Sequence, residues 1–174
     1  PRSTLFPYTT LFDLLSYLDL NRSGLHVAVQ NWEHDFNIGS IVRTANAFNV
    51  GGVHIIGRRR WNRRGAMVTD RYLHVHHHET EETLFDWLGE RGIEAVGVDN
   101  LPGSVPLETA ILPRDVCLVF GSEGLGLTPG AVAGCTQLAA ITQRGSTRSL
   151  NAGAAAAIAM YHWALQHPVT EPLA

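Results

Sequence analysis

The sequence predicts an α/β protein built on a mostly parallel sheet with helices on both faces. Short runs of β-branched and apolar residues alternate along the chain with amphipathic or Ala-rich helical patterns. Strands that alternate with helices pair in parallel, because each helix carries the chain back across the sheet. Strands are expected at 25–30, 52–57, 93–98, 116–120 and 137–141, and helices at 38–49, 80–91, 128–134 and 149–166.

The composition indicates one soluble, cytoplasmic domain. Of 174 residues, 45% are hydrophobic and 17% charged, and no apolar run approaches the roughly 20 residues of a membrane helix. The net charge of -3 argues against a uniformly basic nucleic-acid binder, but it leaves room for a local basic patch. Cys117 and Cys135 lack the spacing of metal ligands, so both are expected to be reduced and structural.

The first residues are set aside from the fold. The stretch "PRSTLFPYTTLF", residues 1–12, matches one reading frame of a common sequencing-adapter DNA and is expected to be a translated artefact. We therefore assign residues 1–23 to an artefactual or non-native segment, residues 24–168 to the folded domain and residues 169–174 to a tail.

A helix carrying an arginine follows the first strand in "NWEHDFNIGSIVRTANAFNV". Asp35 or Asn37 is expected to cap this helix, and Arg43 lies away from its apolar face. That arginine is either a solvated surface residue or a fixed cation near an anionic substrate. Ligands of open parallel sheets bind beyond the carboxyl ends of the strands, so this loop and those after 116–120 and 137–141 are candidate sites.

A glycine-rich loop, "FGSEGLGL", follows the strand at 116–120. It lacks the Gly-Lys-Ser/Thr of a P-loop and the order GxGxxG. Glycines let a ligand approach the backbone, and the carboxylate of Glu123 would repel phosphate, so a neutral or cationic ligand is expected. The alternative is an ordinary tight connection.

The third loop and its helix read "RGSTRSLNAGAAAAIAM". Ser149 or Asn151 is expected to cap the helix. The Ala and Gly residues that follow either allow another backbone to approach closely or serve only as good helix formers packed on the sheet.

Two further segments concentrate cations or imidazoles. The stretch "GRRRWNRRG" suits RNA, because guanidinium groups pair with phosphates and an indole can stack on a base. The alternative is an ordinary solvated loop. The predicted RNA contacts are Arg58, Arg59, Arg60, Trp61, Arg63 and Arg64. In "YLHVHHHET", His74, His76 and His78 share one side of an extended segment, which we expect to be exposed or RNA-facing and not a metal site.

Taken together, "NIGSIVRTANAFNVGGVHII", "LVFGSEGLGL" and "STRSLNAGAAAAIAMY" resemble the three signature motifs of the SpoU/TrmH group of RNA ribose methyltransferases, part of the SPOUT superfamily. The resemblance implies a deep trefoil α/β knot, S-adenosylmethionine as cofactor, no metal, and a homodimer whose active site is shared across the interface.

The same resemblance assigns residues to roles. The cofactor-binding positions are Phe120, Gly121, Gly126, Ile141 and Leu150. The catalytic positions are Asn37, Arg43, Glu123, Ser149 and Asn151. The chain departs from the family in "ITQRGS", where relatives often carry a proline and a more apolar loop.

The expected reaction is transfer of the sulfonium methyl to a ribose 2′-hydroxyl of tRNA or ribosomal RNA, with Arg43 orienting the hydroxyl. Two alternatives stay open, a base methyltransferase with the same fold and a non-catalytic RNA-binding module. A small-molecule methyltransferase fits less well, since it has no use for "RRRWNRR".

Overall fold

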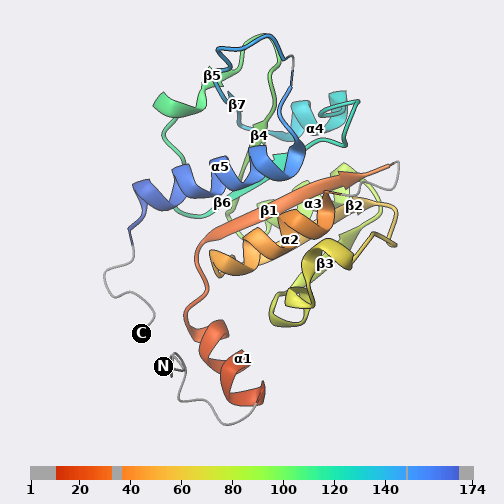
Figure 1. Ribbon diagram of the computed structural model, residues 1–174, viewed down its shortest axis with the longest axis vertical. Coiled ribbons are helices and arrows are strands. Elements are labelled where there is room, and N and C mark those ends of the chain that lie inside the picture. The colour runs from red at the N-terminus through yellow and green to blue at the C-terminus, as the bar shows by residue number, and fades with distance from the viewer. Residues whose placement is uncertain (1–10, 33–36, 148, 169–174) are drawn as a thin grey trace.

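The computed structural model describes residues 11–32, 37–147 and 149–168, which form a seven-stranded sheet (Figure 1). The strands lie in the order β3-β2-β1-β6-β4-β7-β5, and every pairing is parallel. The strands are β1 (Leu25–Asn31), β2 (Gly52–Gly57), β3 (Val75–His78), β4 (Glu94–Val98), β5 (Val105–Pro106), β6 (Val116–Phe120) and β7 (Gln137–Ala140). The predicted α/β class is confirmed, while the threaded knot stays a prediction.

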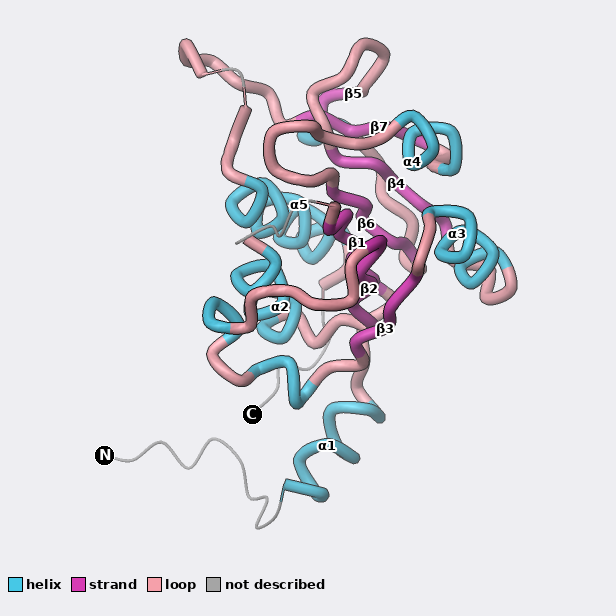
Figure 2. The backbone as a smooth tube through the Cα atoms, turned by 90° about the vertical axis from the view of Figure 1, so that its right-hand side faces the viewer, coloured by secondary structure: helices cyan, strands magenta, loops and turns pink. Residues whose placement is uncertain are grey.

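Helices cover both faces of the sheet, with α2 and α5 on one side and α3 and α4 on the other (Figure 2). The helices are α1 (Leu11–Leu20), α2 (Ile38–Ala47), α3 (Glu81–Gly89), α4 (Pro129–Gly134) and α5 (Ala152–Gln166). Short 3-10 turns occur at Arg64–Ala66, Thr69–Tyr72 and Leu107–Thr109. Among the described residues no helix has the length and apolarity needed to cross a bilayer.

The five predicted strands and four predicted helices are all present, with ends shifted by up to three residues. Two strands were not among those predicted. β5 has only two residues, too few for a pattern to show. β3 lies in the histidine run that was expected to be extended, and it adds to the sheet edge beside β2.

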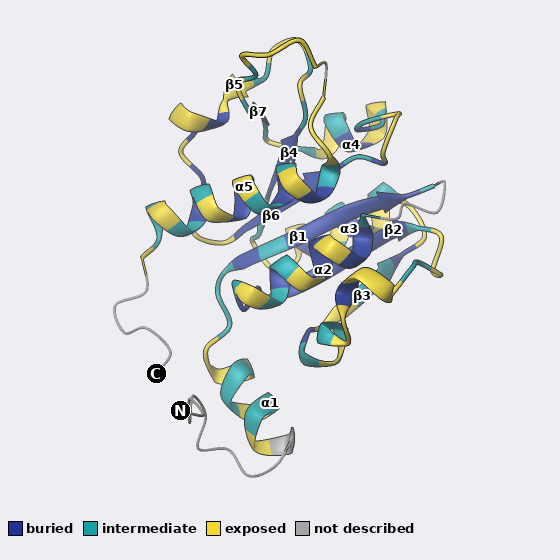
Figure 3. Cartoon of the chain, viewed as in Figure 1, coloured by how far each residue is buried: buried dark blue, intermediate teal, exposed yellow. Residues whose placement is uncertain are grey.

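The core has two layers, one on each face of the sheet, and the central strands β1, β6 and β4 are buried along most of their length (Figure 3). Cys117 is fully buried and Cys135 half-buried; both are free thiols, and burial raises the pKa of Cys135 to about 12. The Ala-rich side of α5 packs on α2: a Cβ atom on Gly153 would lie 3.4 Å from the Ser40 side chain, and Ala156 is fully buried. The close backbone approach expected at α5 is therefore met within the chain, by α2.

The segment before β1 is attached to the domain by hydrogen bonds. The Asn49 amide donates to the carbonyl oxygens of Leu18 at 3.1 Å and Asn21 at 2.9 Å. The Arg22 guanidinium donates to the Tyr72 carbonyl at 2.8 Å. The predicted artefact at 1–12 lies mostly outside the described residues, and the domain boundary at 23 stays a prediction.

Three histidines form a buried chain of ring-to-ring hydrogen bonds beneath Trp87 of α3. His26 Nδ1 lies 3.0 Å from His54 Nε2, and His54 Nδ1 lies 2.9 Å from His78 Nε2. His78 is buried and His76 half-buried, so the expectation that this run is exposed or RNA-facing was wrong for both. The reason is non-local: α3 crosses the strand and places Trp87 over the imidazoles.

We expect the protein to lose stability as the pH falls from 6.5 toward 4. A neutral imidazole has one donor and one acceptor, so an added proton leaves two donors facing each other. Burial lowers the pKa of His26 to about 4 and that of His54 to about 2, against roughly 6.5 in the unfolded chain. The unfolded state therefore binds more protons in this window, and linkage for His26 alone predicts a loss on the order of 3 kcal/mol in the free energy of unfolding.

Urea unfolding at several pH values measures this effect. Replacement of His54 with leucine should weaken the dependence below pH 6.5, because it removes the imidazole that faces both His26 and His78. A wild-type protein whose unfolding free energy is constant from pH 6.5 to 4 would contradict the prediction.

Candidate active site

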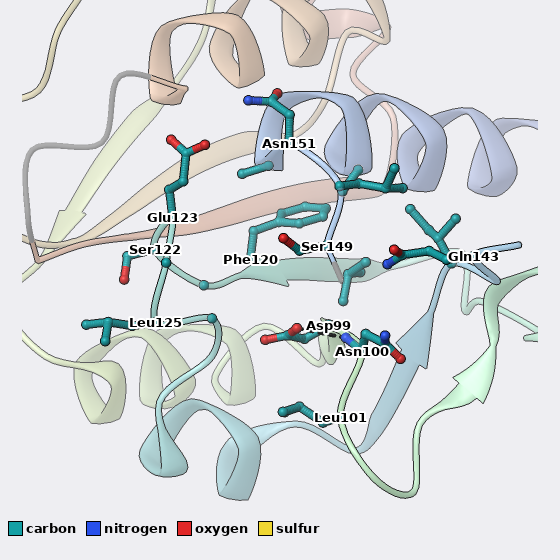
Figure 4. Close-up of a pocket in the computed structure, with 18 residues that line it drawn as sticks. Asp99, Asn100, Leu101, Phe120, Ser122, Glu123, Leu125, Gln143, Ser149 and Asn151 are labelled. Carbon is teal, nitrogen blue, oxygen red and sulfur yellow. Dashed lines mark hydrogen bonds between the residues drawn. The ribbon is translucent and has the colours of Figure 1, made fainter. Parts of the chain in front are cut away.

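A pocket of about 510 Å³ opens at the carboxyl ends of β4, β6 and β7 (Figure 4). This is the edge at which parallel sheets bind ligands. The residues predicted to bind the cofactor all line it, namely Phe120, Gly121, Gly126, Ile141 and Leu150.

The first, second and third motifs meet beside this pocket. The Asn37 amide at the start of α2 donates to the Glu123 carboxylate, and the Asn151 amide at the start of α5 donates to Asn37 Oδ1 at 2.8 Å. Glu123 and Asn151 line the pocket, as does Ser149. Four of the five predicted catalytic residues are thus brought together from segments that are far apart in the sequence.

The amide of Asn37 does not serve as a helix cap. Asn37 is the N-cap residue of α2, but its side chain makes no capping hydrogen bond, because both of its polar atoms are engaged by Glu123 and Asn151. The other candidate, Asp35, lies outside the described residues. At α5 the prediction of a cap is confirmed for Asn151, whose Oδ1 accepts from the Ala154 N–H.

The loop after β6 folds back on itself, and Gly121 makes this turn sterically feasible. A Cβ atom on Gly121 would lie 1.9 Å from the carbonyl carbon of Gly126, far inside van der Waals contact. The Gly126 N–H donates to the Ser122 carbonyl at 3.0 Å, and Asp99 Oδ2 accepts from the Leu127 N–H at 2.8 Å. The main effect of Gly121 is therefore to let the loop close on itself, and letting a ligand approach the backbone is its lesser effect.

The pocket favours a cationic or neutral ligand. It contains the carboxylates of Asp99 and Glu123, and no lysine or arginine occurs among its described lining residues. Apolar side chains, including Leu101, Ile141 and Leu150, supply much of the rest of its wall.

Arg43 is the predicted catalytic residue that this chain does not bring to the pocket. It is exposed on α2, six residues beyond Asn37, a displacement of about 9 Å along a helix. Within the described part of the chain it has no hydrogen bond or ion pair, and it does not line the pocket.

The stretch "GRRRWNRRG", residues 57–65, is called the basic loop here. It lies beside the start of α2, where a Cβ atom on Gly39 would lie 2.8 Å from Gly65 Cα. Asn31, at the end of β1, anchors the loop: its amide donates to the carbonyl oxygens of Arg58 at 2.7 Å and Arg60 at 3.0 Å. The arginines of the loop, which are Arg58, Arg59, Arg60, Arg63 and Arg64, are exposed.

Trp61 in this loop is half-buried and packs against the core. The Arg63 guanidinium lies 5.5 Å from the ring centroid, so part of the indole is covered. Arg63 also pairs with Asp70 at 3.3 Å. The arginines thus present charge to solvent, whereas Trp61 mainly holds the loop in place.

Sequence reasoning gave no role to Asn31, Asp99 or Gln143, which the structure places at the loop anchor and in the pocket. The only local signal was a polar residue at the end of each strand, as at Asn31 and Asp99. Among the described residues no group of His, Cys, Asp or Glu is arranged to hold a metal ion. The expectation that the protein needs no metal stays a prediction.

The fold defines a parallel α/β protein with a pocket at the carboxyl edge of its sheet, and the linked amides of Asn37 and Asn151 beside that pocket come from two different motifs. Residues 24–161 match the SpoU rRNA Methylase family. The chain belongs to that family.

Several named proteins are similar to this chain. An uncharacterized tRNA/rRNA methyltransferase of Mycobacterium avium is 32% identical over 85% of the chain and 49% of its own length. The 23S rRNA (guanosine-2′-O-)-methyltransferase RlmB of Coxiella burnetii is 33% identical over 78% of the chain and 56% of its own length. The chain spans about half the length of the curated relatives it matches.

Solved structures agree with the fold. An rRNA methyltransferase from Sinorhizobium meliloti, crystallised with AdoMet bound, superposes with a TM-score of 0.75 at 25% identity, covering 86% of this chain and 59% of that one. The SpoU methyltransferase AviRb from Streptomyces viridochromogenes gives a TM-score of 0.75 at 26% identity, covering 83% and 60%.

Proposed function

We propose that this chain is the methyl-transfer domain of an S-adenosylmethionine-dependent RNA methyltransferase that acts in the cytoplasm on a ribose 2′-hydroxyl of tRNA or ribosomal RNA. The observation that carries the proposal is the Glu123, Asn37 and Asn151 contact beside the pocket, which joins all three family motifs. The names of the similar proteins, which include 2′-O-methyltransferases of both RNA classes, support it.

The pocket residues fit this cofactor. S-adenosylmethionine supplies a methyl group on a positively charged sulfonium, and the nearby carboxylates of Asp99 and Glu123 suit that charge. Phe120, Ile141 and Leu150 offer apolar surface to the adenosine. Gly121 and Gly126 keep the backbone of the loop close to the ligand.

The chain's residues would then prepare the hydroxyl. A ribose 2′-hydroxyl is a poor nucleophile while protonated, so its proton must be removed or polarised as the methyl departs. The guanidinium group of an arginine is too weak an acid to lose its proton, so the side chain is not available as a base. Arg43 therefore orients the hydroxyl and an adjacent phosphate, which accepts the proton, while Asn37, Glu123, Ser149 and Asn151 fix the surrounding loops.

We propose that the protein is a homodimer in which a second copy covers α2 and α5. The outward side of α5 carries Ile158, Tyr161 and Leu165, which are 43%, 58% and 61% exposed. Their spacing places them in one stripe along the helix, and the exposed Arg43 lies on the neighbouring helix on the same face of the sheet (Figure 2). Docking of a second copy would bury this stripe and bring Arg43 to the pocket of the partner subunit.

Replacing Tyr161 with glutamate is expected to convert the dimer to a monomer and abolish methyl transfer, because the new carboxylate must be desolvated at the centre of the interface. Sedimentation velocity measures the mass. Leu20→Glu, at another exposed apolar residue (86%) at the end of α1 and outside α2 and α5, should remain dimeric. A dimeric Tyr161→Glu variant would show that this face is not the interface.

We propose that the exposed arginines of the basic loop bind RNA phosphates, with Trp61 anchoring the loop. Combined replacement of Arg58, Arg59 and Arg60 with alanine should weaken RNA binding by about tenfold or more and reduce its salt dependence by about 0.7 in the log-log slope per lost contact. Affinity for S-adenosylhomocysteine should not change. Filter binding across a salt series measures both effects, with Arg114→Ala as the control, and an unchanged slope would refute the loop's role.

Methyl transfer from radiolabelled S-adenosylmethionine to transcripts of tRNA and ribosomal RNA tests the function itself. A 2′-O-methyl nucleotide blocks alkaline cleavage at its 3′ side, so the product should survive as an uncleaved dinucleotide. A cleaved methylated nucleotide would indicate base methylation instead. RNA binding without any transfer by the dimer would indicate a binding module.

A further inference from the structure

The pocket contains a buried hydrogen-bond acceptor that has no donor. Gln143, two residues beyond Ile141 in the loop after β7, lines the pocket. Its Oε1 atom is buried, and the described residues provide no hydrogen-bond partner for it. The carboxamide end of Gln143 points toward Ser149 (Figure 4). Because a buried carbonyl oxygen without a donor is unfavourable, a bound ligand is the natural source of that donor.

The backbone that carries this carboxamide is tethered at the residue before it. The Glu108 carboxylate accepts from the Thr142 N–H at 3.2 Å and from the Thr142 hydroxyl at 3.0 Å. Glu108 thus ties the loop after β7 to the turn after β5. The backbone next to Gln143 is therefore held at the edge of the pocket in advance of ligand binding, which lowers the cost of ordering this loop.

The surroundings of Gln143 indicate what kind of donor is expected. The apolar side chains of Leu101, Ile141 and Leu150 line the same pocket and suit a flat, neutral ring. A carboxamide presents an acceptor and a donor side by side. That pair matches the exocyclic amine of adenine and the ring nitrogen next to it, the same pairing by which Asn and Gln recognise adenine in nucleic acids.

We propose that Gln143 recognises the adenine of the cofactor, with Oε1 accepting from the exocyclic amine and Nε2 donating to the adjacent ring nitrogen. The inference rests on the proposed function, in which this pocket holds S-adenosylmethionine. It assigns a specificity-determining side chain to the segment "ITQRGS" after β7.

Isothermal calorimetry with two ligands tests this assignment without turnover. The ligands are S-adenosylhomocysteine and its 6-deamino analogue, in which purine replaces adenine and the exocyclic amine is missing. Wild-type protein should prefer the adenine ligand, and Gln143→Met, which keeps the size of the side chain, should reduce that preference by about tenfold, the worth of one such hydrogen bond. Gln137→Met, a half-buried glutamine of β7 outside the pocket, should keep the wild-type preference.

The outcomes separate the two proposals. If wild-type protein and Gln143→Met both bind S-adenosylhomocysteine, and with the same preference over the deamino analogue, Gln143 does not recognise adenine. The proposed function would then still stand. If wild-type protein binds neither ligand, the cofactor assignment and this inference both fail. Circular dichroism of Gln143→Met confirms that a change in preference does not come from unfolding.

Discussion

Replacing Arg43 with alanine is expected to lower the rate of methyl transfer by about 10²- to 10⁴-fold, the range for loss of a group that assists proton transfer or stabilises developing charge. The affinity for S-adenosylhomocysteine should remain within about twofold of wild type, since the proposed role of Arg43 is to orient the RNA hydroxyl and its phosphate and not to contact the cofactor. The dimer should persist. Single-turnover kinetics and calorimetry on the same preparation measure the two quantities.

Two variants control this experiment. Arg43→Lys keeps the charge but not the planar guanidinium, and it should recover only part of the rate. Asn46→Ala, on the same helix, should transfer methyl groups at nearly the wild-type rate. Full activity in the Arg43→Ala protein would remove this arginine from the reaction.

A mixed dimer sharpens the prediction. If Arg43 serves the pocket of the partner subunit, a dimer of one Arg43→Ala chain and one Gly121→Ala chain retains a single intact site, built from the Arg43 of the second chain and the pocket of the first. Such mixtures should recover activity that neither variant has alone. An inactive mixture would place Arg43 at its own pocket or outside the reaction.

Replacing Gly121 with alanine is expected to weaken cofactor binding by roughly 10- to 100-fold and to destabilise the fold by about 1–3 kcal/mol, the usual cost of overpacking. The added methyl would lie 1.9 Å from the Gly126 carbonyl carbon and 2.3 Å from the Leu127 nitrogen, so the loop must open. Calorimetry and thermal unfolding measure the two effects.

The control for that change is Gly145→Ala in the loop after β7, where an added Cβ meets no atom within 4 Å. It should bind the cofactor and melt nearly as the wild-type protein does. A Gly121→Ala protein with wild-type affinity would show that the closed loop is not required for binding.

Five of the strands and four of the helices were predictable because each carries its own periodic pattern. The residues predicted to be catalytic or cofactor-binding come from three motifs, and the structure gathers all of them at one edge of the sheet except Arg43. What local pattern does not encode is which strands become neighbours. The placement of β4 between β6 and β7 is what brings Asp99 to the loop at Leu127 and Gln143 into the same pocket.

The histidine run also shows that a local pattern does not encode which elements pack together. Alternation correctly placed His76 and His78 on one side of an extended segment, but it could not say which side is covered. His54 from β2 and Trp87 from α3 decide that, and both belong to other elements than the histidine run. Asn37 likewise is of a residue type that often caps helices, yet its amide forms hydrogen bonds with residues 86 and 114 positions away.

Those two separations also bear on how the protein folds. Contacts between residues far apart in the chain form late, since long loops must close before such contacts provide any stabilisation. The Glu123, Asn37 and Asn151 contact cannot exist until α5 has been synthesised and docked. During synthesis this group of side chains would therefore assemble only after the segment through α5 has left the ribosome, so its presence would report that this domain has folded.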